Sequence, residues 1–99
     1  MQDLIDKVSK WGAARGITLH GKPMTQAIKT LEETHELLEA INKGDERETR
    51  DAIGDIVVTL IMQCELQGYK LEECLAGAYS EIKDRRSEER RVGKECRIG

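Results

Sequence analysis

The sequence predicts an all-α protein built from four amphipathic helices. Charged residues make up 35% of the chain and aromatic residues only 3%, with no Phe and a single Pro. This composition suits amphipathic helices better than a sandwich or a barrel. A 3.6-residue apolar period also recurs in four segments. Ninety-nine residues fall within the size of one domain, which we expect to span residues 1–86.

The first two helices are expected at about residues 2–14 and from residue 24 to about residue 43. In the first, apolar residues recur at helical spacing: Leu4, Ile5, Val8 and Trp11. Three glycines and a proline then indicate a loop. In the second helix the apolar positions are Ala27, Ile28, Leu31, Leu38 and Ile41. Gly44 follows at a usual helix stop.

The third helix is expected from residue 45 or 46 to Gly68, and the fourth from Leu71 to about Arg86. The segment IVVTLI in the third helix is rich in β-branched residues and, taken alone, could form a strand. Its flanks keep a 3.6-residue period for about twenty positions, much longer than a usual strand. We therefore predict a helix there as well.

The last residues of the chain differ in pattern from the rest. The segment RSEERRVGKECR, from Arg86 to Arg97, has no core-facing period and resembles a translated sequencing adapter. We expect residues 87–99 to be a non-native or disordered tail, with the natural C-terminus missing. We expect this tail to have no part in the function.

Charge and cysteine content limit the classes of partner. The net charge of -3 and the pI near 5.4 offer no long-range attraction for nucleic acid or anionic lipid. The three cysteines are odd in number and fit neither a disulfide framework nor a zinc pattern. No apolar run resembles a signal peptide or a membrane span. We expect a cytoplasmic protein that binds neither a nucleic acid polymer nor a membrane.

Acidic residues mark the second and third helices at helical spacing. Glu33 and Glu36 are three residues apart, and Asp51 and Asp55 are four apart, so each pair stacks on one helix face. The turn near Gly44 folds the helices antiparallel and brings the pairs to similar height. Acids on a lone helix are usually solvated, but four that face one another favour a hard cation. Oxygen ligands indicate Mg²⁺ or Mn²⁺.

These motifs also carry a family resemblance. The segments EETHE and DAIGD, within four helices ending in AYSEIKDR, resemble the MazG-like all-α nucleotide pyrophosphohydrolases over about residues 1–86. The family's first motif is matched in full by Glu32, Glu33 and Glu36. In its second motif, Glu-x-x-Asp, Asp55 supplies the final acid and Ala52 stands in place of the Glu. Asp51 lies one turn before Asp55, as in small members that have DxxGD.

The resemblance implies roles for several side chains. Four carboxylates would ligate Mg²⁺, namely Glu33, Glu36, Asp51 and Asp55, and Glu32 would orient or deprotonate the attacking water. Lys83 and Arg85 would contact phosphate, although solvation at a helix end is the alternative. Trp11 would stack on a base and His20 would touch base or phosphate. A core Trp and an exposed loop His are the ordinary alternatives.

The sequence thus predicts a four-helix MazG-like bundle, assembled as a homodimer or homotetramer because one short chain can hardly bury its apolar stripes. The predicted activity is magnesium-dependent hydrolysis of (deoxy)nucleoside triphosphates to monophosphate and pyrophosphate. Two alternatives stay open. One is an enzyme like phosphoribosyl-ATP pyrophosphohydrolase. The other is a catalytically silent helical dimerisation or regulatory module, which Ala52 favours.

Overall fold

The computed structural model describes residues 1–16 and 21–85, and these residues form helices and turns but no strand. The helices are α1 (Gln2–Ala14), α3 (Pro23–Lys43), α4 (Glu46–Gln67) and α5 (Leu71–Lys83). The all-α class is confirmed. The helix boundaries agree with expectation except at α5, which ends before Arg85 and Arg86. His20 and the predicted tail at 87–99 lie outside the described residues.

Local signals in the sequence account for the ends of α3 and α4. Pro23 occupies the first turn of α3, where its missing N–H would have no partner in any case. Gly44 ends α3 with φ +73°, a left-handed conformation that favours glycine. The Asp45 side chain caps α4 by accepting a hydrogen bond from the Glu48 N–H at 3.0 Å. The turn between the two helices is therefore encoded by adjacent residues.

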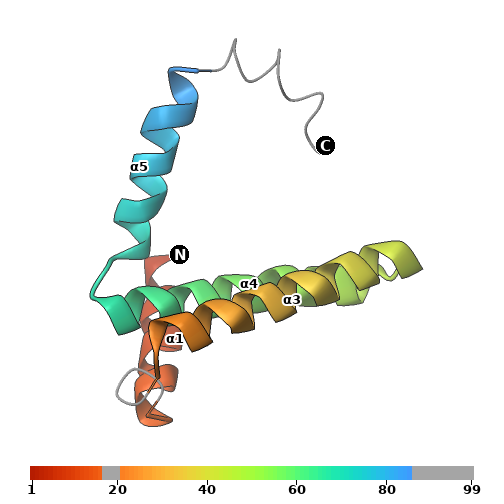
Figure 1. Cartoon of the computed structure of the whole chain (residues 1–99), viewed down its shortest axis with the longest axis horizontal. Coiled ribbons are helices and arrows are strands. Elements are labelled where there is room, and N and C mark those ends of the chain that lie inside the picture. The colour runs from red at the N-terminus through yellow and green to blue at the C-terminus, as the bar shows by residue number, and fades with distance from the viewer. Residues whose placement is uncertain (17–20, 86–99) are drawn as a thin grey trace. The chain divides into compact units, whose positions relative to one another are not determined.

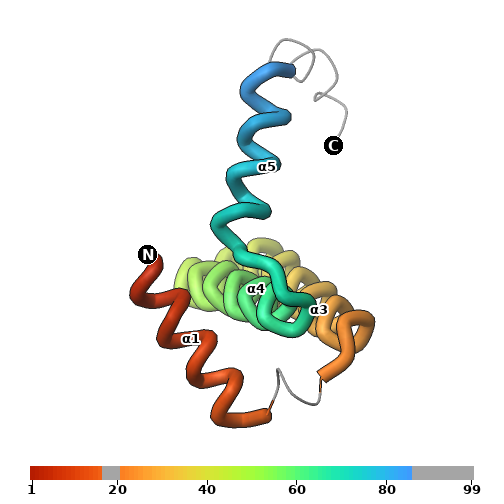
Figure 2. The backbone as a smooth tube through the Cα atoms, turned by 90° about the vertical axis from the view of Figure 1, so that its left-hand side faces the viewer, coloured from red at the N-terminus to blue at the C-terminus, as the bar shows by residue number. Residues whose placement is uncertain are grey.

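The described residues divide into two compact units, the first ending at Tyr69 and the second beginning at Lys70. In the first, α3 and α4 pack side by side as an antiparallel hairpin and α1 lies across α4 (Figure 1, Figure 2). The second unit holds α5, an amphipathic helix with acidic residues in its first turn and Lys83 in its last. Within the described residues, no helix has both the length and the apolar character of a membrane span.

Polar and small side chains form much of the contact between α3 and α4. The buried Gln26 donates from Nε2 to the carbonyl of Thr59 at 3.1 Å, and Thr30 Oγ1 donates to Thr59 Oγ1 at 2.8 Å. Ala40 and Ala52 are buried on the two helices. Because hydrogen bonds between specific atoms tolerate little sliding, these contacts hold the two helices in one register.

The apolar stripe predicted for α3 does not face α4. Four of its members are exposed in the single chain, Ile28, Leu31, Leu38 and Ile41, as are three apolar residues of α4, Ile53, Val57 and Leu60. The prediction was partly right for α4, where Ile61 and Cys64 are buried. The remaining apolar core consists of small residues and Met62. Among the residues that the structure describes, the strongest apolar face of α3 is thus largely exposed in the single chain.

The packing of α1 depends on the absence of a side chain at Gly12. This residue is buried, and a Cβ added to it would overlap the sulfur and terminal methyl of Met62 on α4. Ser9, one turn earlier, donates a hydrogen bond to Glu65 Oε2 at 3.0 Å. The absence of a side chain at Gly12 therefore leaves room for the end of the Met62 side chain against α1.

Because Met62 is almost fully buried, its flexible end has little room to move aside, and we expect Gly12→Ala to lower the free energy of unfolding by about 1 kcal/mol, the low end of the cost of overpacking. The control is Gly54→Ala in α4, where an added Cβ meets no atom within 4 Å. That change should raise stability by roughly 0.5–1 kcal/mol through helix propensity. Urea unfolding of both variants measures the difference. Stabilisation by both would show that α1 does not pack closely at Gly12.

Candidate active site

A carboxylate lies in the contact between α3 and α4. Glu33 is half-buried, and its Oε1 atom is inaccessible to solvent and has no hydrogen-bond partner. Burial raises the pKa of this carboxyl above its ordinary value of 4.5, and the nearby charges of Glu36, Asp55 and Glu32 raise it further. A buried acid that lacks a partner and is surrounded by other acids is unfavourable by itself. Such a group is typical of a site that receives a ligand.

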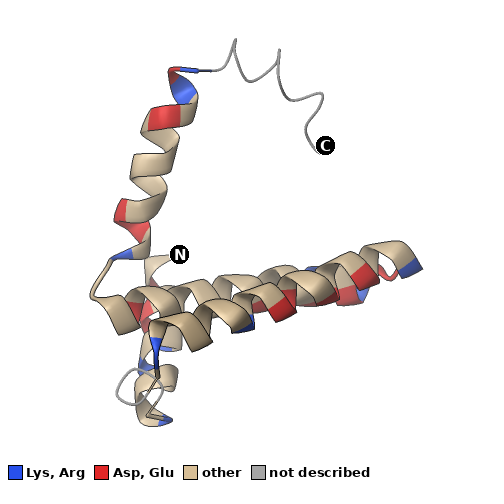
Figure 3. Cartoon of the chain, in the orientation of Figure 1, with Lys and Arg blue, Asp and Glu red and all other residues tan. Residues whose placement is uncertain are grey.

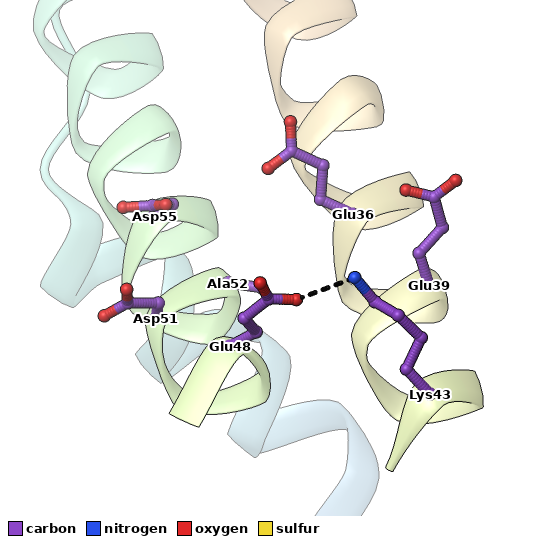
Figure 4. Close-up of a pocket in the computed structure, with 7 residues that line it drawn as sticks. All are labelled: Glu36, Glu39, Lys43, Glu48, Asp51, Ala52 and Asp55. Carbon is purple, nitrogen blue, oxygen red and sulfur yellow. Dashed lines mark ion pairs between the residues drawn. The ribbon is translucent and has the colours of Figure 1, made fainter. Parts of the chain in front are cut away.

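A cavity of about 340 Å³ opens beside these acids. Its lining comes from the ends of α3 and α4 that meet at the Gly44 turn, where acidic residues gather on both helices (Figure 3). It consists of five acids, one lysine and one alanine: Glu36, Glu39, Glu48, Asp51, Asp55, Lys43 and Ala52 (Figure 4). The cavity is therefore strongly acidic.

The structure brings the predicted acids of the two helices into one region. Glu36, Asp51 and Asp55 share the cavity wall, and Glu33 lies near enough to Glu36 and Asp55 for their charges to raise its pKa. Asp55 has apolar neighbours in the sequence, yet its side chain is exposed in the single chain. Ala52, which replaces the Glu of the family motif, is buried between the helices.

The donor chemistry of this region matches a hard divalent cation. Within the described residues, no three acidic, histidine or cysteine side chains are positioned to hold a metal ion. The partnerless oxygen of Glu33 and the raised pKa of its carboxyl nevertheless mark an excess of negative charge between packed helices. Carboxylate oxygens are the ligands that Mg²⁺ prefers. The residues present fit such an ion by charge and donor type.

Lys43 and Glu48 form an ion pair at the edge of the cavity. Nζ of Lys43 lies 3.1 Å from Oε1 of Glu48 across the Gly44 turn (Figure 4). The hydrogen bond to Glu48 raises the pKa of the lysine, and the charges of Glu48, Asp45 and Glu39 add to this effect. Neither residue was predicted from the sequence to belong to the site. Their positions on either side of a predicted turn were the available signal.

The remaining predicted contacts lie apart from this cavity or in the second unit. Trp11 is 45% exposed and does not line the cavity, and the Arg15 guanidinium lies 4.9 Å from its ring centroid. The ammonium of Lys83 lies 5.8 Å from the ring centroid of Tyr79 in α5. Lys83 and Arg85 belong to the second unit, and His20 lies outside the described residues.

The comparisons with known proteins agree with the acidic hairpin. The family model of the MazG nucleotide pyrophosphohydrolase domain matches residues 22–89, which include α3, α4 and α5. No curated protein and no solved structure matches the chain significantly. Enzymes of this family generally use a divalent metal. The match covers more than half of the sequence, and the chain therefore belongs to the MazG nucleotide pyrophosphohydrolase domain family.

Proposed function

We propose that the protein hydrolyses (deoxy)nucleoside triphosphates to the monophosphate and pyrophosphate in a Mg²⁺-dependent reaction, with Mn²⁺ as a substitute. The observation that carries the proposal is Glu33, a carboxylate without a partner, crowded by Glu36 and Asp55 between two packed helices. A silent helical module has no use for carboxylates that are crowded in this way. A site that binds a cation and then a polyphosphate uses their negative charge to hold the cation.

The side chains proposed to hold Mg²⁺ are Glu33, Glu36, Asp51 and Asp55. When bound, the ion would neutralise phosphate charge and lower the pKa of a coordinated water. Glu32 extends from the adjacent position of α3, and we assign it to orienting the attacking water or accepting its proton. The water oxygen bonds to the α-phosphorus, and the bond from that phosphorus to the bridging oxygen breaks. Pyrophosphate leaves.

Two further assignments complete the proposal. Lys83 and Arg85 would stabilise the phosphates by charge-assisted hydrogen bonds, and Trp11 and His20 would contact the base.

An enzyme like phosphoribosyl-ATP pyrophosphohydrolase remains an alternative within the same chemistry. A silent module is the alternative from another class, and the buried Ala52 in place of a family acid favours it. We place the protein in the cytoplasm.

We also propose that the chain works as a homodimer or homotetramer. At the helical register of α3 and α4, the acids lie along one side of the hairpin and the exposed apolar residues along the opposite side. Large contiguous apolar patches on a soluble chain usually mark an interaction site. A second copy can cover this side and leave the acidic cavity open.

The activity predicts pyrophosphate release from nucleoside triphosphates with Mg²⁺ and none with EDTA. Glu36→Gln should reduce kcat by at least about 100-fold while the oligomer stays folded, because the change removes a metal ligand from the exposed wall of the cavity. A panel of canonical and modified nucleotides, together with phosphoribosyl-ATP, identifies the substrate. The control is Glu72→Gln, an acid in the first turn of α5. A lack of release from every substrate would favour the silent module.

Glu33 predicts a pH-dependent stability of the metal-free protein. The pKa of this carboxyl is raised in the folded state. Its contribution to the free energy of unfolding is therefore complete below pH 4.5 and is lost as pH rises through the folded-state pKa. Glu33→Gln should therefore be more stable than wild type in EDTA, by a margin that grows as pH rises above 4.5. In Mg²⁺ the wild type should gain stability by mass action, and the variant should gain much less.

Urea unfolding between pH 4 and pH 8, with EDTA or Mg²⁺, separates these effects. Asp55→Ala should likewise lose the Mg²⁺-dependent rise in Tm. If the free energies of unfolding of wild type and Glu33→Gln changed with pH in the same way, this result would contradict the crowding of charge around Glu33. A Tm unaffected by Mg²⁺ in the wild type would contradict the metal assignment.

Oligomerisation predicts that a charge on the apolar side of α3 dissociates the assembly. Leu31→Asp places a carboxylate at a position that is 68% exposed in the single chain, where an interface would bury it. Lys29→Asp, on a different face of the same helix, is the control. Sedimentation velocity should show dissociation of the first variant only. A monomeric wild type would exclude the assembly.

A further inference from the structure

The acidic cavity contains a lysine that the proposed carboxylate site does not use. Lys43 is the last residue of α3 and lines the cavity together with five acids and Ala52. Among the described residues that line this cavity, it is the single cation. Figure 4 shows its side chain extending from α3 toward Glu48 of α4. The lysine thus places a positive charge inside an otherwise negative wall.

The position of Lys43 separates it from Glu36, one of the proposed metal ligands. It follows Glu36 by seven residues, which corresponds to about 10 Å along the helix axis. Its ammonium pairs with Glu48 beside the Gly44 turn, at the end of the cavity away from Glu33. A triphosphate is an extended polyanion, so its phosphates require positive charge at more than one point. The carboxylates alone provide no positive charge.

Lys43 can readily exchange Glu48 for another partner. The two side chains are 61% and 53% exposed, and ion pairs as exposed as this one contribute little to stability. A phosphate oxygen carries more charge than a single carboxylate oxygen and accepts strong hydrogen bonds from an ammonium. The lysine can therefore leave Glu48 without disrupting the hairpin.

We propose that Lys43 is a substrate-binding residue whose ammonium contacts the terminal phosphates of the nucleoside triphosphate, with Glu48 as its partner before substrate binds. This assignment rests on the proposed function and goes beyond it, because it sets the direction in which the substrate lies. The pyrophosphate that leaves is the portion bound near the Gly44 turn. The nucleoside lies toward the opposite end of the cavity.

The test compares Lys43→Met with Arg50→Met in the full chain. Both changes remove one positive charge from an exposed residue that has an acidic partner, but Arg50 pairs with Glu46 at 4.0 Å and does not line the cavity. Lys43→Met should raise KM for the triphosphate by roughly 5- to 10-fold with a much smaller change in kcat. Lys43→Arg should restore most of the loss, and Arg50→Met should leave KM unchanged.

Calorimetry with inorganic pyrophosphate and Mg²⁺ gives a readout that is independent of turnover. Lys43→Met should weaken pyrophosphate binding by a similar factor while leaving the affinity for the nucleoside monophosphate product unchanged. Equal weakening of both products, or identical behaviour of Lys43→Met and Arg50→Met, would overturn the assignment and leave the proposed function intact. A wild-type protein that hydrolyses no triphosphate would overturn both.

Discussion

The close packing of α3 against α4 is the constraint on which the cavity depends. Small residues, Ala40 and Ala52, and the polar contacts of Gln26 with Thr59 allow the two backbones to approach. Glu33 lies within this contact instead of outside it, so its carboxyl loses hydration. The free energy lost there is offset by the rest of the hairpin contact. Stability and the proposed binding of a metal ion are therefore in opposition at one residue, as is common at functional sites.

The same geometry explains why the hairpin has two unlike sides. When two helices pack antiparallel in a fixed register, residues at the same position of the helical repeat lie on the same side of the pair. In this chain the acids share one side, and Leu31, Leu38, Ile53 and Val57 lie toward the other. A long hairpin with small residues in its own contact has few large side chains left for a core. Its apolar side chains are then exposed in the single chain, so the proposed assembly and the acidic cavity need not use the same surface.

Local signals allowed most of the fold to be predicted from sequence. Pro23, Gly44, Asp45 and Gly68 each act within a few residues of themselves, so the ends of α3 and α4 followed from the chain alone. The face that packs was harder to predict. Periodicity identifies the most apolar stripe of a helix but does not say which neighbour covers it. The contact of α3 with α4 instead uses Gln26 and Thr30, residue types that usually indicate a surface.

The site shows the same division between local and tertiary information. The spacing of Glu33, Glu36, Asp51 and Asp55 was visible because helical period is local, and the structure places them in one region. Lys43 and Glu48 were missed because each alone resembles an ordinary surface charge. They meet only because the Gly44 turn reverses the chain between them. A positive charge beside an acidic cluster is thus a tertiary property: the residues on either side of the turn meet only once the two helices pack, and neither position alone reveals it.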